Sequence, residues 1–192
     1  MDEVGRANLL AMQDTHRKDG TIAPFYFDIR KAQSHQKARR EIAKAFSQLI
    51  RGSDKSLLVA GIPEAMTPLA SIVGHNLDMK LVQPRANPKT HGLQKSVEGD
   101  FEPGERVILL DDVINSGDSK LKAIEQINNA GLEVEKLIVL IDGEQGGVEA
   151  MRAAGYEICT GFTITSLLHH LLEMGKITQN EYDIALDFVR SN

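Results

Sequence analysis

The 192-residue sequence has little of what marks several common protein classes. Its one cysteine, Cys159, excludes an internal disulfide framework and is compatible with a reducing compartment. It has no tryptophan, and no apolar run is long enough for a membrane span. The N-terminus is polar and carries Asp2 and Glu3, which is not the pattern of a signal peptide. We therefore expect a soluble, cytoplasmic protein.

No single stretch of the chain concentrates charge of one sign. The chain has 22 lysine and arginine residues against 27 aspartate and glutamate residues, a formal net charge of −5, and both signs are spread along it. Without a basic tract, nucleic acid is not an expected partner. The length is enough to bury a good core, and we expect one domain over residues 1–192.

Strand patterns alternate with helix patterns along most of the chain. The stretches that predict strands are residues 25–29, 57–62, 80–83, 107–110, 137–141 and 157–162. The helix patterns cover residues 3–14, 36–51, 65–74, 119–130 and 147–154, with two more helices near the C-terminus. A capping box at Thr178–Glu181 begins the last of them. Such alternation predicts an α/β fold with a mostly parallel, doubly wound sheet flanked by helices.

The run from Val107 to Ser119 says most about function. Val107–Leu110 is a buried strand, and Asp111 and Asp112 stand where we expect it to end. A turn at Asn115–Gly117 follows, and Ser119 is then placed to cap a helix. Because backbone amides at such a turn bind anions, acids beside them suit a phosphorylated ribose. The simpler alternative is that the two acids only punctuate a strand end.

This run resembles the phosphoribosyl diphosphate (PRPP) signature of type I phosphoribosyltransferases, with Asn115 in place of the usual threonine. Four further segments, in the same order, resemble orotate phosphoribosyltransferase, in particular the form found as a domain of UMP synthase. They are Lys18–Asp28, Gly61–Ala70, Pro84–Gly99 and Asp142–Gly147. The resemblance covers nearly the whole chain. It implies the type I phosphoribosyltransferase fold, with a small hood from about residues 1–35 and a mobile active-site loop at 84–104.

The resemblance also implies a reaction. A pyrimidine nitrogen of orotate displaces diphosphate from PRPP and forms orotidine 5′-monophosphate in the biosynthesis of UMP. The cofactor implied is Mg²⁺, bound mainly through PRPP, and no protein side chain is expected to be a metal ligand. A homodimer with shared active sites is implied as well, since the loop of one subunit closes over the site of its neighbour.

Site residues follow from the matched motifs. The catalytic group comprises Lys89 and His91, which reach the diphosphate, and Asp111 and Asp112, which hold the ribose hydroxyls. These four also bind PRPP, together with Arg85, Asn115, Ser116, Gly117, Asp118 and Ser119. The base-binding residues are Lys18, Tyr26, Phe27 and Gly143. Without the resemblance, Lys89 and His91 read as solvated loop residues, and the two aromatics as core packing.

Five further positions, besides Asn115, depart from the family pattern. Gly143 replaces an arginine of the orotate site, and Glu64, Ala65 and Ala86 replace a tyrosine and two basic residues. Asp118 adds a carboxylate to a turn meant for phosphate. Two alternatives to orotate transfer therefore stay open: a diverged enzyme for another base, and a silent paralogue that binds PRPP or a nucleotide. We expect Gly143→Arg to raise the use of orotate more than that of uracil.

Overall fold

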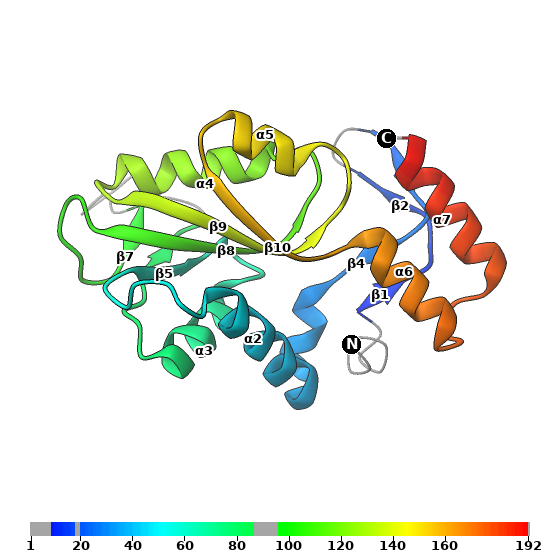
Figure 1. The fold of residues 1–192 in the computed structure, drawn as a ribbon, viewed down its shortest axis with the longest axis horizontal. Helices are drawn as coiled ribbons and strands as arrows, with labels where there is room; N and C mark the ends of the chain where they lie inside the picture. The colour runs from blue at the N-terminus through cyan, green and yellow to red at the C-terminus, as the bar shows by residue number, and fades with distance from the viewer. Residues whose placement is uncertain (1–8, 18–19, 87–95, 192) are drawn as a thin grey trace.

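The protein is built on a parallel four-stranded sheet between two layers of helices (Figure 1). The computed structural model describes residues 9–17, 20–86 and 96–191. The strands, in their order across the sheet, are β10 (Glu157–Thr163), β9 (Glu133–Asp142), β8 (Arg106–Ile114) and β5 (Leu58–Gly61). On one face lie α2 (Gln36–Ile50) and α3 (Thr67–Leu77), and on the other α4 (Asp118–Asn129) and α5 (Gly147–Ala153). The predicted doubly wound α/β fold is confirmed.

The strand predicted at 80–83 is reduced to one bridge at the edge of this sheet. Leu81 pairs in parallel with Val59 of β5, and the chain then forms β6 (Gln83–Pro84), which pairs with β7 (Val97–Glu98). Counted in chain order, this edge segment, β5, β8, β9 and β10 lie in the order 2-1-3-4-5. The order reverses between β5 and β8. Open sheets of this kind bind ligands beyond the carboxyl ends of the strands at such a reversal.

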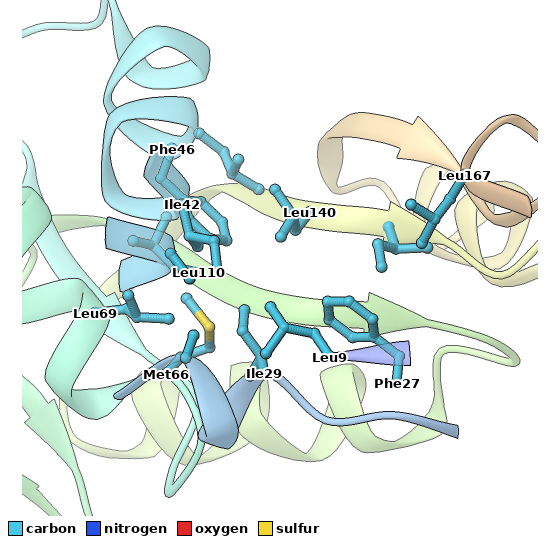
Figure 2. Packing of buried hydrophobic residues seen from close by; sticks show 14 of the residues in the cluster. Leu9, Phe27, Ile29, Ile42, Phe46, Met66, Leu69, Leu110, Leu140 and Leu167 are labelled. Carbon is cyan, nitrogen blue, oxygen red and sulfur yellow. The ribbon is translucent and has the colours of Figure 1, made fainter. Parts of the chain in front are cut away.

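Side chains on β8 supply both cores, because successive residues of a strand point to opposite faces. Ile108 and Leu110 belong to the core under α2 and α3, whereas Val107 and Leu109 belong to the core under α4 and α5. Figure 2 shows the first of these, in which Leu110 lies among side chains of α2 and α3. The buried strand predicted at 107–110 is therefore confirmed.

The described part of the N-terminal segment, from Leu9 on, does not continue the helix predicted over residues 3–14. It forms the short strand β1 (Leu10–Ala11), which pairs antiparallel with β4 (Tyr26–Phe27). The N–H of Asp28 donates to the Leu9 carbonyl over 2.7 Å, so the backbone of this segment bonds to β4 instead of to a helical turn of its own. Leu9 and Leu10 of this segment are buried in the core, in which Figure 2 labels Leu9.

The segment predicted to form the hood also contains short elements, and the last two helices lie beside it. The short elements are β2 (Thr15–His16), β3 (Ile22–Ala23) and the 3₁₀ helix η1 (Ile29–Ser34). Beside them in Figure 1 lie α6 (Ile164–Glu173) and α7 (Gln179–Ser191). The predicted capping box is present: Thr178 N–H donates to Glu181 Oε2 over 2.7 Å, and Glu181 N–H donates to Thr178 Oγ1 over 3.3 Å. Across the described ranges, none of the helices has the length and apolar character needed to cross a membrane.

Candidate active site beyond the ends of β5 and β8

The turn after β8, residues Asn115–Ser119, is called the phosphate turn below. The strand runs four residues past its predicted end, so Asp111 and Asp112 lie within it, and Asp111 pairs with Val139 of β9. Gly117, with a φ of 93°, is the N-cap of α4 and provides no side-chain cap. The prediction that Ser119 caps this helix is therefore wrong, and Ser119 lies in the first turn of the helix. The backbone N–H groups at this helix start are placed to bind an anion.

Asp118 lies at the mouth of the phosphate turn. Its Oδ2 accepts a hydrogen bond from the Ser116 hydroxyl over 2.8 Å, and both side chains are exposed. A carboxylate in the first turn is favourable because it faces the positive end of the helix dipole. The same end attracts a phosphate, so Asp118 competes for the position that the turn offers to a ligand.

The two strand-end acids differ in their surroundings. Asp111 is 4% exposed, and its Oδ2 lies 2.5 Å from Nζ of Lys120, which is 7% exposed. Burial raises the pKa of Asp111 to about 6, and Lys120 acts against this rise. Asp112 is half-buried, and its Oδ1 accepts the N–H of Val113 over 2.8 Å. Of the two carboxylates, only Asp112 has surface to offer to a ligand.

Arg30, which sequence analysis missed, comes from the start of η1 and lies near Asp112. Its Nε donates to Asp28 Oδ1 over 3.0 Å, and its Nη2 donates to the Tyr26 hydroxyl. The hydrogen bond to Asp28 raises the pKa of Arg30, and the charge of Asp112 acts in the same direction. The signal in the sequence was a basic residue two positions after Asp28, the last residue of a matched segment.

A cleft of about 640 Å³ opens beside the carboxyl end of β5. Its lining comes from η1, from the loop after β5 and from β6, and consists of Arg30, Gln33, Pro63, Glu64, Thr67, Pro68, Gln83, Pro84, Arg85 and Ala86. Arg85 is also ion-paired with Glu98 of β7. The cleft thus contains three positions singled out in the sequence, Arg85, Glu64 and Ala86. Its charged side chains are the cations Arg30 and Arg85 and the acid Glu64.

The loop after β5 is held against β8. Its first glycine, Gly61, has no room for a side chain, because an added Cβ would lie 2.6 Å from the Met66 carbonyl oxygen. The N–H of Ile62 donates to the Leu110 carbonyl over 2.9 Å. The loop therefore begins directly beside Asp111 and Asp112, on the other side of the reversal in strand order.

The predicted base-binding residues are only partly accessible. Tyr26 is 36% exposed, but Phe27 is 8% exposed and packs in the core, so Phe27 has no face free for a base. Gly143 uses its N–H to donate to the Ile114 carbonyl over 2.8 Å. A Cβ added at Gly143 would lie 2.1 Å from Asn115 Oδ1. Gly143→Arg must therefore displace Asn115 as well as add the cation on which its expected effect depends, and that effect stays a prediction.

Three predicted site residues, Lys18, Lys89 and His91, lie outside the described residues. The two sides of the 87–95 segment are joined by Gln126 of α4, whose Nε2 donates to the carbonyl oxygens of Arg85 over 2.9 Å and Ser96 over 2.8 Å. Within the described ranges there is no group of three or more His, Cys, Asp or Glu residues that could hold a metal ion.

Known proteins share this arrangement. A family model for the phosphoribosyl transferase domain matches residues 31–153. An orotate phosphoribosyltransferase from Rhodopirellula baltica is 36% identical over 76% of this chain and 80% of its own length. The chain belongs to the orotate phosphoribosyltransferase family. The resemblance inferred from its motifs is confirmed, while the two alternatives, another base and a silent paralogue, draw no support from these relatives.

Two further relatives extend the match over the hood. An orotate phosphoribosyltransferase from Sulfolobus acidocaldarius is 28% identical over 90% of this chain and 87% of its own length. The solved structure of UMP synthase from Leishmania donovani is similar with a TM-score of 0.92 at 25% identity, and the match covers all of this chain. The chain spans 41% of that synthase, so it corresponds to one part of the larger protein.

Proposed function

We propose that the protein is an orotate phosphoribosyltransferase, which joins orotate to the phosphoribosyl group of PRPP and releases diphosphate, in the biosynthesis of UMP. The observation that carries the proposal is the position of Asp112 and the phosphate turn. They stand together at the reversal in strand order, beside a cleft that contains Arg30 and Arg85. Asp112 can accept hydrogen bonds from ribose hydroxyls, and the two arginines in the adjacent cleft can bind a diphosphate.

The geometry suits a dissociating ribosyl cation. Backbone N–H groups of the phosphate turn hold the 5′-phosphate, and the Asp112 carboxylate accepts hydrogen bonds from the ribose hydroxyls. Its negative charge favours the cationic character that the ribose gains as diphosphate departs. Arg85 lies in the cleft, where it can bind the diphosphate as negative charge develops on it. Lys89 and His91 are proposed to contact the same diphosphate. Fixing both reactants in this way lowers the entropic part of the barrier.

The base is proposed to lie against the hood. Tyr26 presents a ring with 36% of its surface exposed, and Arg30 donates a hydrogen bond to its hydroxyl, which fixes the ring. An aromatic face of this kind stacks on a planar pyrimidine. Lys18 is proposed to meet the carboxylate of orotate. Because Gly143 carries no side chain, that carboxylate meets one cation fewer than in relatives with arginine.

Magnesium and assembly belong to the same proposal. Mg²⁺ prefers oxygen ligands, which PRPP supplies, and the half-buried Asp112 carboxylate adds negative charge at the site without being required as a ligand. When bound, the ion neutralises charge on the departing diphosphate. We propose a cytoplasmic homodimer in which the 84–104 loop of one subunit completes the site of the other. Sedimentation of the 21.1 kDa chain at about twice its mass would agree with this.

The test is turnover of orotate with PRPP and Mg²⁺. Wild type should form orotidine 5′-monophosphate, and Asp112→Asn should lower kcat/KM for PRPP by about 100-fold or more, because it removes a charge at the developing cation. Asp183→Asn, the same change on the exposed face of α7, is the control and should leave kcat/KM unchanged. A folded wild-type protein that gives no product with orotate would refute the proposal.

A further inference from the structure

Two charged side chains, Asp111 and Lys120, stand out because they are buried within the described part of the chain. Asp111 Oδ2 and Lys120 Nζ are 2.5 Å apart, with 6% and 9% of the respective side chains exposed. One comes from β8 and the other from the first turn of α4. The ion pair therefore ties the two ends of the phosphate turn together from its buried side.

Lys120 makes a second contact, to the exposed side of the same turn. Its Nζ lies 3.3 Å from Oγ of Ser119, which is exposed. An ammonium group has three hydrogens to donate and cannot accept. The Ser119 oxygen must therefore accept this bond, which leaves the hydroxyl hydrogen of Ser119 to donate to a different partner.

Asp112 is turned away from this pair. Consecutive strand residues point to opposite faces, and Asp112 lies within the electrostatic reach of Arg30, on the hood side. The two neighbouring side chains thus leave β8 on opposite faces, Asp111 toward Lys120 of α4 and Asp112 toward the face that carries Leu110. Asp111 and Asp112 are therefore not equivalent candidates for binding the ribose.

We propose that Lys120 is a positioning residue of the phosphate turn: it holds Asp111 away from the ribose and orients the Ser119 hydroxyl toward the 5′-phosphate. This inference rests on the proposed function, since it assigns roles at the same PRPP site. The ammonium cancels the charge of a buried carboxylate that would otherwise repel an incoming phosphate. Asp112 is then the one strand-end acid that contacts the ribose.

The first experiment compares the two acids by isothermal titration with PRPP and Mg²⁺. Asp112→Asn should weaken binding by about tenfold or more, because it removes a charged acceptor for the ribose hydroxyls. Asp111→Asn keeps Lys120 beside Ser119 and should stay within about threefold of wild type. If Asp111→Asn is folded by circular dichroism and loses as much affinity as Asp112→Asn, Asp111 contacts the ribose and the inference is wrong.

The second experiment asks whether Lys120 acts through Ser119. Ser119→Ala should raise KM for PRPP by about tenfold in the wild-type background, with kcat almost unchanged, because the 5′-phosphate is bound equally in ground and transition states. In the charge-free background Asp111→Asn/Lys120→Met, the same change should cost less than about twofold. Lys120→Arg keeps the cation and should restore the larger effect of Ser119→Ala. An equal effect of Ser119→Ala in both backgrounds would overturn the positioning role.

These outcomes separate the inference from the proposed function. If wild type neither binds PRPP nor turns over orotate, the proposed function fails. If wild type does both and the variants behave otherwise than stated, only the inference fails. Should the charge-free double variant not fold, the comparison of Asp111→Asn with Asp112→Asn decides alone.

Discussion

The phosphate turn follows β8 and the cleft lies beside the end of β5, on the two sides of the reversal in strand order, and they are built differently. Beneath the phosphate turn, the charge of Asp111 in β8 is matched by Lys120 of α4, and both residues are buried. In the cleft, Arg30 and Arg85 are held by acids at or near the surface, Asp28 and Glu98. The phosphate turn is thus supported by a buried ion pair, whereas the ion pairs of the cleft are in contact with solvent.

This difference has an energetic meaning. A buried ion pair is strongly coupled to stability because removing one partner leaves an unpaired charge in the core, whereas an exposed pair contributes little. Substitutions of the buried Asp111–Lys120 pair should therefore change the free energy of unfolding, whereas substitutions of exposed residues in the cleft and on the phosphate turn should change ligand affinity instead. Each prediction below tests one side of that contrast.

The largest expected effect is that of Lys120→Met on stability. The variant leaves Asp111 unpaired, and we expect a loss of about 3–5 kcal/mol in the free energy of unfolding, measured with urea. Lys122→Met, two residues along the same helix but exposed, is the control and should cost less than about 0.5 kcal/mol. Adding Asp111→Leu to Lys120→Met should recover most of the loss, and no recovery would show that the lysine stabilises the fold by some contact other than Asp111.

The next effect is a dependence of stability on pH. The pKa of Asp111 rises from its ordinary 3.8 to about 6 in the folded protein, through burial and through the neighbouring charge of Asp112. The folded state then binds more protons than the unfolded state between these values, so its stability falls as the pH rises from about 4 to 6. Relative to Asp111→Asn, wild type should lose about 2 kcal/mol over this window. The opposite slope would show that Lys120 outweighs burial and lowers the pKa of Asp111.

A smaller loss is expected where the phosphate turn meets the end of β9. Gly143→Ala brings a Cβ to within 2.8 Å of the Ile114 carbonyl oxygen and 2.1 Å of Asn115 Oδ1. We expect about 1–3 kcal/mol of destabilisation by thermal unfolding, as in other overpacked sites. Asn115→Ser removes the second clash alone, so the double variant should recover part of the loss. Full recovery would mean that the backbone moves away from residue 143 with little cost.

Local patterns predicted the elements but not these differences between neighbouring residues. The face of α2 that carries Ile42 and Phe46, the buried strand at 107–110 and the capping box at Thr178 each follow from a few adjacent residues, and all are confirmed. The helix predicted over residues 3–14 is wrong in its described part because pairing with β4, a tertiary contact, outweighed helix periodicity.

The site shows the same division. Motif spacing located the phosphate turn. It did not distinguish the buried Lys120 from the exposed Lys122, because the burial of Lys120 depends on its contact with Asp111 of β8. The steric link between Gly143 and Asn115 joins residues 28 positions apart, and only the parallel pairing of β8 with β9 brings them together. Tyr26 and Phe27 are equal candidates by type, and the face of a two-residue strand decides between them.

On the cleft side, Arg85→Gln should leave stability nearly unchanged, within about 0.5 kcal/mol, because its ion pair with Glu98 is partly exposed. We expect KM for PRPP to rise about tenfold, since a charge-assisted contact to the diphosphate is lost. Arg106→Gln is the control, because that arginine is also ion-paired at the surface, with Glu135, at the start of β8 and far along the strand from the site. A large loss of stability in Arg85→Gln would remove the contrast between the two regions.

The smallest effect is expected from Asp118→Ser, and it runs in the opposite direction. The change removes a carboxylate that faces the incoming phosphate at the start of α4, while a hydroxyl can still accept from Ser116 as Asp118 does over 2.8 Å. PRPP affinity should therefore improve by about threefold to tenfold at low salt, and the gain should shrink at 0.5 M salt because screening weakens the repulsion. The loss of a favourable helix-dipole contact should cost about 0.5 kcal/mol in stability, measured by urea unfolding.

Glu125→Gln, which removes an exposed charge farther along α4, controls for the change in net charge and should leave PRPP affinity as it is. If Asp118→Ser weakens PRPP binding instead, Asp118 is itself a ligand contact of the phosphate turn, and its carboxylate serves the substrate, either through a hydrogen bond or through Mg²⁺ carried by PRPP.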